Sequence, residues 1–211
     1  MLVLLVLFFA RKRLMYFAFF CGALLLFSGL KMADVKARQG GHLWVVYRVP
    51  KATALGFISG GQGQLLADSS FYANPKNQAY LVQPHWQQLG LTATRSDTLQ
   101  ADRRPAKVPA LLLPDGNQLL LWQGVKILLC RQPLQAATLQ KVKPKFILLS
   151  HHPYLALDEL APALQGVHVI LDGSNGWRYQ QQVEQKLTKA GISCYNVNKR
   201  GAFIQPVSSE D

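Results

Sequence analysis

Two adjacent histidines follow an apolar run in the second half of the chain, within the sequence Ser150-His151-His152-Pro153. An imidazole can ligate a metal or transfer a proton near neutral pH, so this pair is a candidate for either chemistry. Neighbouring side chains of an extended segment point in opposite directions, which means that only one of the two histidines would face a given site. The alternative interpretation is a loop in which both histidines are exposed or hydrogen bonded.

A second polar cluster, Asp172-Gly173-Ser174-Asn175, follows another apolar run. Asp172 stands at the end of a predicted strand, where a carboxylate can act as a metal ligand or a general base. The same residue types also favour the start of a helix, because the oxygens of Ser174 or Asn175 can accept hydrogen bonds from the free N–H groups of the first turn. We take the candidate pocket to comprise His151, His152, Asp172, Ser174 and Asn175.

Three glycines in the sequence Gly60-Gly61-Gln62-Gly63 separate two predicted strands. Glycine tolerates the positive φ angles of tight turns, so the segment predicts a hairpin turn. A phosphate-binding loop would need a helix directly after the glycines, and no helical pattern follows them.

The chain is strongly basic, with 23 lysines and arginines against 11 acidic residues and a formal net charge of +12. Six basic residues and one acidic residue precede residue 39, which leaves 17 basic and 10 acidic residues, or +7, for the rest. Residues 91–107 lack an apolar period, which predicts a loop. A basic loop fits the phosphates of single- or double-stranded DNA or the head groups of a membrane lipid, and a solvated basic face has the same composition. The predicted nucleic-acid contacts are Arg95, Arg103, Arg104 and Lys107.

The first 30 residues are apolar or small except for the basic triplet Arg11-Lys12-Arg13. Residues 14–30 carry no charge and approach the length needed to cross ~30 Å of hydrocarbon, so they predict a transmembrane helix. The apolar run before the triplet is too short to span, and we interpret it as the end of another helix. The chain would then be the tail, or a shortened relative, of a longer membrane protein. Because basic residues favour the cytoplasmic side, the rest of the chain is expected on the outer, periplasmic face of the plasma membrane.

The remaining chain divides into a linker (31–41), one domain (42–206) and a short tail (207–211). Strand-like runs dominate the first half of the domain, and strands alternate with helices after residue 146. Pro84 should kink the helix that Asn74 and Pro75 open. The pattern predicts an α/β fold, a mixed α/β sandwich. Predicted strands are 43–47, 55–58, 65–67, 110–113, 118–122, 125–130, 146–149, 167–171, 192–197 and 202–204, with helices opening near residues 74, 158 and 174.

Taken in order, these motifs resemble the C-terminal, metallo-β-lactamase-like domain of the ComEC family, the membrane channel of bacterial DNA uptake. Residues 57–64 (FISGGQGQ) stand where the family has a strand ending in Asp-Val-Gly-Gln-Gly-Asp, and residues 150–153 resemble its later His-His-Gly element. Residues 172–175 fall in the family's next strand-to-helix turn, and Gly191 with residues 201–204 resembles its ending. The resemblance covers about residues 42–206. It implies a metallo-β-lactamase-like fold and a role in DNA uptake beside the channel-forming part of a competence system.

The family's metal-ligand motifs are largely missing. Its two acids around Gly-Gln-Gly are Ser59 and Gln64 here, and its His-x-His-x-Asp-His cluster has no counterpart. The three cysteines form no Cys-x-x-Cys motif, so neither a zinc site nor a disulfide framework is indicated. We therefore expect a degenerate domain without metal, cofactor or catalytic residues, which binds or scaffolds. The alternatives are a divergent metal-dependent hydrolase or nuclease that uses His151 and Asp172, and an unrelated membrane-anchored interaction domain.

Overall fold

The computed structural model describes residues 14–39, 41–99 and 108–207. The chain separates into two compact units, Met1–Gly40 and Gly41–Asp211. The three hydrophobic clusters found among the described residues all belong to the second unit, so this unit has a core of its own.

The first unit contains one described helix, α2 (Leu14–Gln39), which bears exposed apolar side chains such as Phe19 and Leu25. The uncharged run over residues 14–30 predicts a transmembrane helix, and a helix does form there. Within the described residues, however, no helix has both the length and the apolar character needed to cross a membrane, so the transmembrane prediction is not confirmed. Residues 31–39, assigned above to a linker, continue α2 instead.

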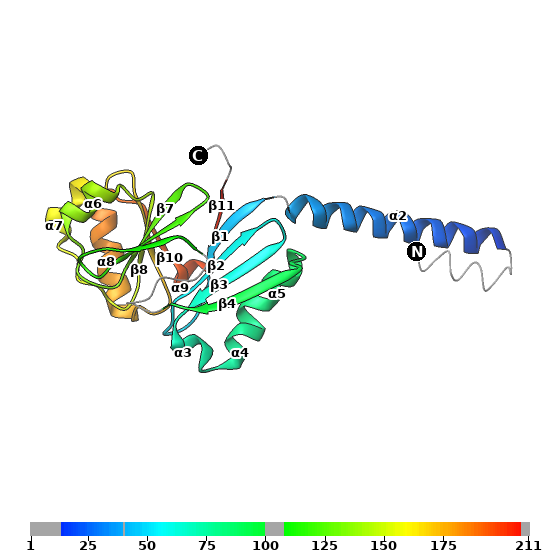
Figure 1. Ribbon diagram of the computed structural model, residues 1–211, viewed down its shortest axis with the longest axis horizontal. Helices are drawn as coiled ribbons and strands as arrows, with labels where there is room; N and C mark the ends of the chain where they lie inside the picture. Colours follow the sequence, from blue (N-terminus) through cyan, green and yellow to red (C-terminus); the bar gives the residue numbers. More distant parts are fainter. Residues whose placement is uncertain (1–13, 40, 100–107, 208–211) are drawn as a thin grey trace. The chain divides into compact units, whose positions relative to one another are not determined.

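The second unit is built on two mixed sheets (Figure 1). In the first sheet, with strand order β11-β1-β2-β3-β4, only β3 and β4 run parallel among the described pairs. In the second, with order β10-β9-β8-β7-β6-β5, the strands β10, β9, β8 and β7 run parallel, and β6 is antiparallel to both β7 and β5. The first sheet contains β1 (His42–Val46), β2 (Ala54–Ser59), β3 (Gln62–Ala67), β4 (Ala93–Thr98) and β11 (Phe203–Val207). The second contains β5 (Ala110–Leu112), β6 (Gln118–Trp122), β7 (Val125–Cys130), β8 (Phe146–Leu149), β9 (His168–Leu171) and β10 (Cys194–Asn196).

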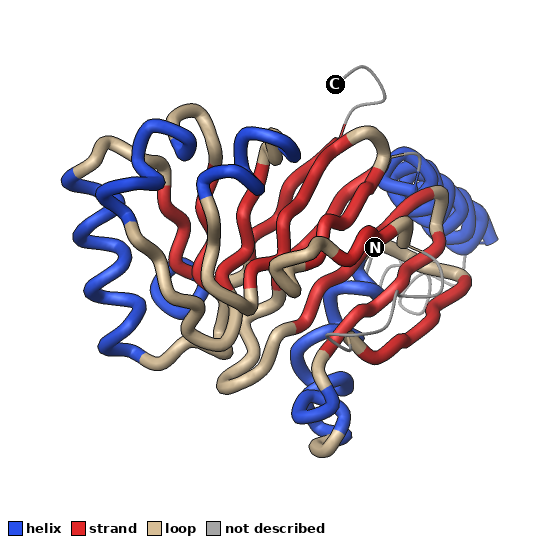
Figure 2. Tube along the Cα trace, turned by 60° about the vertical axis from the view of Figure 1, so that its left-hand side comes forward, coloured by secondary structure: helices blue, strands red, loops and turns tan. Residues whose placement is uncertain are grey.

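Helices cover the outer face of each sheet, and the inner faces pack on each other (Figures 1 and 2). The cluster between the sheets joins Trp44 and Phe57 of the first sheet to Leu120 and Leu148 of the second. This arrangement confirms the predicted α/β sandwich. The first sheet is covered by α3 (Ser69–Tyr72), α4 (Pro75–Asn77), the π-helix η1 (Gln78–Val82) and α5 (Gln83–Gln88). The second is covered by α6 (Ala136–Val142), α7 (Leu157–Leu160), the 3₁₀ helix η2 (Ala161–Leu164) and α8 (Trp177–Lys189), while α9 (Val197–Arg200) follows β10.

Local signals in the sequence locate several turns correctly. Gly60 and Gly61, with φ angles of 56° and 75°, form the two-residue turn between β2 and β3, as predicted for this glycine segment. Asn74 caps α4, and its side chain accepts a hydrogen bond from the N–H of Lys76. The helix after Asn74 changes to the π-helix η1, which ends two residues before Pro84, where a kink was expected.

The prediction of a loop over residues 91–107 is wrong for its first part. Residues 93–98 form β4, which pairs in parallel with β3 at the edge of the first sheet. The strand is mostly exposed and polar, and it therefore lacks the alternation of apolar residues by which a half-buried strand is identified.

Candidate functional site

The site lies where three parallel strands end at the same level. Cys130, Leu149 and Leu171 are aligned across β7, β8 and β9. The residues that directly follow these strands are Arg131, Ser150 and Asp172, so the register brings the three side chains to one edge of the second sheet. Clefts at the carboxyl ends of parallel strands are the usual binding sites of open α/β sheets.

The first sheet adds two further polar residues to this edge. Asp68 directly follows β3, and its backbone N–H donates to the carbonyl of Thr53 at 3.0 Å. The N–H of Thr53 in turn donates to Asp68 Oδ2 at 2.8 Å. This reciprocal pair holds Asp68 and Thr53 against each other, and the hydroxyl of Thr53 reaches across to the second sheet.

Asp172 is the fully buried centre of the cluster, with 0% of its surface exposed. Its Oδ2 accepts from Thr53 Oγ1 at 2.5 Å, and its Oδ1 accepts from Ser174 Oγ at 2.5 Å and from Asn175 Nδ2 at 2.9 Å. A hydroxyl has one proton, and that of Thr53 is used on Asp172, so the 2.5 Å contact between Ser150 and Thr53 is donated by Ser150. Burial raises the pKa of Asp172 to about 6, although the hydrogen bonds from Ser174 and Thr53 oppose this shift.

Asp68 forms an ionic cluster with Arg131 and His151 beside this buried centre. The guanidinium of Arg131 pairs with Asp68 Oδ1, and His151 Nε2 lies 2.9 Å from Asp68 Oδ2. Burial acts to raise the pKa of Asp68, but the hydrogen bond from His151 and the charge of Arg131 outweigh it, and the pKa is lowered. The hydrogen bond to Asp68 raises the pKa of His151, against the opposing effect of partial burial. His151 is the accessible member of this cluster, because 46% of its side chain is exposed.

The two histidines occupy a backbone conformation that residues with a side chain rarely adopt. Both have a φ angle of 59°, in the left-handed region. Their backbone N–H groups are held by the β9–α8 turn, since that of His151 donates to Ser174 Oγ and that of His152 to Asn175 Oδ1, each at 2.8 Å. This clamp directs the His151 ring toward Asp68, while the His152 ring accepts a hydrogen bond from the N–H of Gly176 at 2.5 Å.

The prediction that Ser174 or Asn175 caps the following helix is wrong. The N-cap of α8 is Gly176. The oxygens of Ser174 and Asn175 instead accept from the 151–152 backbone, 23 residues earlier in the chain. Tertiary partners therefore replace the helix N–H groups that the local pattern suggested.

The structure brings the five predicted pocket residues together but separates their roles. His151 belongs to the ionic cluster, Asp172 is buried beside that cluster, and His152 packs against Tyr179 on α8. Of the predicted nucleic-acid contacts, Arg95 is exposed on β4. The other three, Arg103, Arg104 and Lys107, lie outside the described residues.

Thr53, Asp68 and Arg131 also belong to the site and were not predicted from the sequence. Asp68 and Arg131 share a signal with Asp172, namely a charged residue directly after an apolar run, Leu65-Leu66-Ala67 in one case and residues 127–130 in the other. That signal identifies the end of a strand. It does not indicate which strand ends meet.

The donor set does not fit a metal centre. Among residues 14–39, 41–99 and 108–207, no group of three or more histidine, cysteine or acidic side chains is arranged to hold an ion. Both oxygens of Asp172 already accept hydrogen bonds from neutral donors. Both oxygens of Asp68 are engaged too, and the neighbouring guanidinium of Arg131 is a fixed positive charge that would repel a metal ion.

A family model described as the ComEC C-terminal domain matches residues 44–206, which is most of the chain. No curated protein and no solved structure matches it.

Proposed function

Because the chain belongs to the ComEC C-terminal domain family, we propose that it takes part in the uptake of DNA by a competence system. In this proposal the second unit, residues 41–211, binds DNA or scaffolds the uptake machinery and does not hydrolyse DNA. It works beside a channel-forming part of that system.

The pairing of Arg131 with Asp68 is the observation that carries the non-catalytic part of the proposal. In a hydrolytic metal centre, carboxylate oxygens must be open to the metal and one coordination position must be open to water. Here an arginine that is 12% exposed supplies the positive charge that balances Asp68. The cluster is thus neutralised by the chain's own side chains, and its geometry supports a stabilising role at the junction of the two sheets.

The DNA-binding part rests on the exposed edge of the first sheet. Arg95 lines a cavity of about 260 Å³ together with the amides of Gln62 and Gln64 and the ring of Trp122. A guanidinium attracts phosphate, and an aromatic ring provides a surface on which a base can stack. This combination favours single-stranded DNA, bound largely without regard to sequence.

Fluorescence anisotropy of a labelled single-stranded oligonucleotide, measured with the full chain over a salt series, tests this part. Replacing the four predicted contacts (Arg95, Arg103, Arg104 and Lys107) by alanine should weaken binding and reduce the slope of log K against log salt by up to about 3, at about 0.7 for each lost phosphate contact. The matched control removes four exposed charges elsewhere, at Lys76, Arg178, Lys186 and Lys189. Equal affinity and slope in the two variants would exclude these contacts, and no binding at low salt would exclude a nucleic-acid role.

The divergent hydrolase is tested separately by elemental analysis of the purified chain and of the variant His151→Ala. The proposal expects well under one zinc or manganese per chain in both proteins. One or two tightly held metals in the wild type, lost in the variant, would establish the hydrolase and overturn the proposal.

We also propose that the chain is attached to the plasma membrane, with residues 41–211 on its outer face. The support is the exposed apolar surface of α2, including Phe19, Leu25 and Leu30, and the membrane setting of the family's competence systems. Attachment predicts that the full chain stays with the membrane pellet after a carbonate wash at high pH. Release of the full chain into the supernatant contradicts the attachment.

A further inference from the structure

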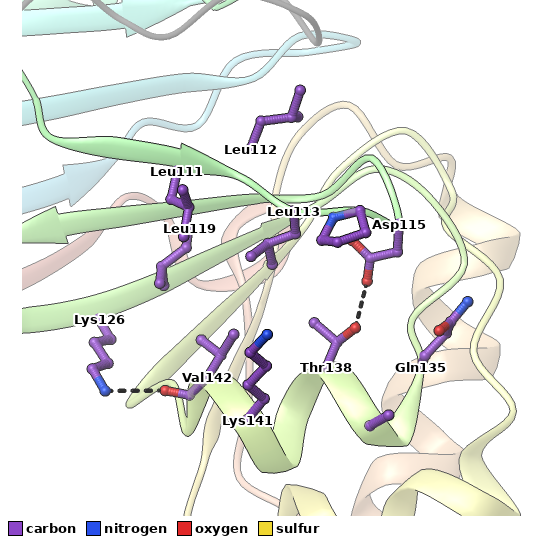
Figure 3. A pocket seen from close by; sticks show the side chains of 12 residues that line it. Leu111, Leu112, Leu113, Asp115, Leu119, Lys126, Gln135, Thr138, Lys141 and Val142 are labelled. Atoms are coloured by element: carbon purple, nitrogen blue, oxygen red, sulfur yellow. Dashed lines mark hydrogen bonds between the residues drawn. The ribbon is translucent and has the colours of Figure 1, made fainter.

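An apolar pocket of about 650 Å³ opens between the β5–β6 hairpin and α6 (Figure 3). Its walls include the cross-strand partners Leu111 and Leu119 on the hairpin and Val142 on the helix. The helix has only seven residues, and β5 is the edge strand of the sheet, so among the described residues α6 leaves this margin of the sheet open. The volume lies within the range of about 300–1,000 Å³ that is typical of ligand pockets.

Exposed leucines continue the apolar wall of the pocket along β6. Leu111 is 47% exposed and Leu121 is 38% exposed. Leu121 lies two residues beyond Leu119 on β6, and side chains alternate along a strand, so Leu121 and Leu119 share one face of the sheet with Leu111. A group of exposed large apolar side chains around a pocket marks an interaction surface.

Lysines border this surface on one side. Lys126 and Lys141 line the apolar pocket, and Lys126 also lines a neighbouring cavity of about 170 Å³ with Lys143 and Lys145. Lys126 is the cross-strand partner of Leu121, so charged and apolar side chains are immediate neighbours. Positive and apolar groups therefore belong to the same surface.

Hydrogen bonds hold one charged side chain at each end of the pocket. The ammonium of Lys126 donates to the carbonyl of Val142 at 3.2 Å, as Figure 3 shows. At the other end Asp115 accepts from the hydroxyl of Thr138 at 2.8 Å and from the N–H of Asn117 at 3.0 Å. The carboxylate of Asp115 is thus engaged locally, and the lysine side of the pocket keeps its positive character.

We propose that this leucine and lysine surface docks on an anionic phospholipid membrane. The partner must offer apolar chains to Leu111, Leu121 and the pocket, and negative charge to the lysines. An anionic phospholipid membrane provides both side by side, because its acyl chains lie directly below a layer of phosphates. Nucleic acid matches the lysines but presents no flexible apolar chain to a pocket that has no aromatic ring in its lining.

Co-sedimentation of the fragment 41–211 with vesicles tests the proposal. This fragment is a compact unit that contains all three hydrophobic clusters, and it lacks α2, so α2 cannot account for any binding. Binding is expected to vesicles of phosphatidylcholine with phosphatidylglycerol and to be much weaker with phosphatidylcholine alone. Each lysine near an anionic lipid surface strengthens binding about fivefold, so Lys126→Gln with Lys141→Gln should weaken it by roughly 25-fold.

Two further variants separate the apolar from the electrostatic contribution. Leu111→Asn should weaken binding at high salt as well as at low salt, because salt screens the lysines but not the apolar contact. Lys186→Gln with Lys189→Gln, on the last turn of α8, removes the same charge elsewhere and should bind like the wild type.

Several results would overturn the proposal. These are equal binding to neutral and anionic vesicles, equal loss in the test and control lysine pairs, or unchanged binding in Leu111→Asn. An oligonucleotide whose binding depends on Lys126 and Lys141, in the absence of vesicle binding, would identify a nucleic-acid surface instead. None of these outcomes alters the loss of DNA binding expected when Arg95, Arg103, Arg104 and Lys107 are replaced by alanine. The two proposals can therefore fail independently.

Discussion

Replacing Arg131 by methionine removes the guanidinium that pairs with Asp68 and keeps a side chain of similar length. In the wild type the side chain of Arg131 is 12% exposed and that of Asp68 is 8% exposed. Loss of one partner from a buried ion pair costs about 3–5 kcal/mol, because the other charge is left without compensation. The lower end of that range applies here, since both groups retain some contact with water and Asp68 keeps a second partner in His151.

The cost should depend on pH through His151. Its folded pKa is raised, so the stability that it contributes is fully present below about pH 6.5 and is lost as the pH rises through the folded pKa. The folded pKa of Asp68 is lowered, so its contribution is present above about pH 4 and is lost only in acid. At pH 6 a protonated His151 can still neutralise Asp68 in the variant, whereas at pH 9 it cannot. We expect Arg131→Met to cost about 3 kcal/mol at pH 9 and less than that at pH 6.

Urea denaturation of the fragment 41–211 at the two pH values measures this cost. The variant Asp68→Asn and the double variant complete a mutant cycle, in which the double variant should be less destabilised than the sum of the single variants. Arg178→Met, on the exposed side of α8, is the matched control and should change stability by under about 0.5 kcal/mol. Two results would refute the ionic cluster of Asp68, Arg131 and His151. One is a loss of stability in Arg131→Met that is the same at pH 6 and pH 9, and the other is a loss in the double variant that equals the sum of the losses in the single variants.

Substitutions at three other positions test the close packing, the backbone conformation and the protonation that the structure shows. A Cβ at Gly173 would lie 1.9 Å from the backbone oxygen of Val49, so Gly173→Ala should lower the free energy of unfolding by at least about 3 kcal/mol. An unchanged midpoint of urea denaturation would contradict this close approach. Lys143 has a φ angle of 48° after α6, so Lys143→Gly should raise the thermal midpoint by stabilising the fold by about 0.5–1 kcal/mol, while Lys143→Ala should not. Burial raises the pKa of Asp172 to about 6, so this carboxyl makes the fold less stable as the pH rises from about 4 to 6. Asp172→Asn should therefore flatten the dependence of stability on pH in that interval. An unaltered pH profile would count against the raised pKa.

Much of the fold was predictable because its signals are local. The turn after β2 needs two residues with positive φ, and Gly60 and Gly61 supply them. Asn74 followed by proline opens α4, and Gly191 follows the end of α8 with a φ angle of 69°. Apolar runs identify the buried strands β7, β8 and β9, since these are covered on both faces. In each case a short stretch of chain contains the physical cause of its own conformation.

The site depended on contacts that no short stretch contains. Asp68 and Arg131 are 63 residues apart, and they meet because β3 of one sheet and β7 of the other end at the same place. Ser174 and Asn175 have the composition of helix caps, yet they accept from the backbone N–H groups of His151 and His152, which are partly buried and have no other acceptor in the described structure. Burying an N–H without an acceptor costs more than leaving a helix end to water, so the tertiary partners take these oxygens. The sequence by itself determined which residues end strands and which segments turn, whereas the packing of two sheets decided which of those ends form a site.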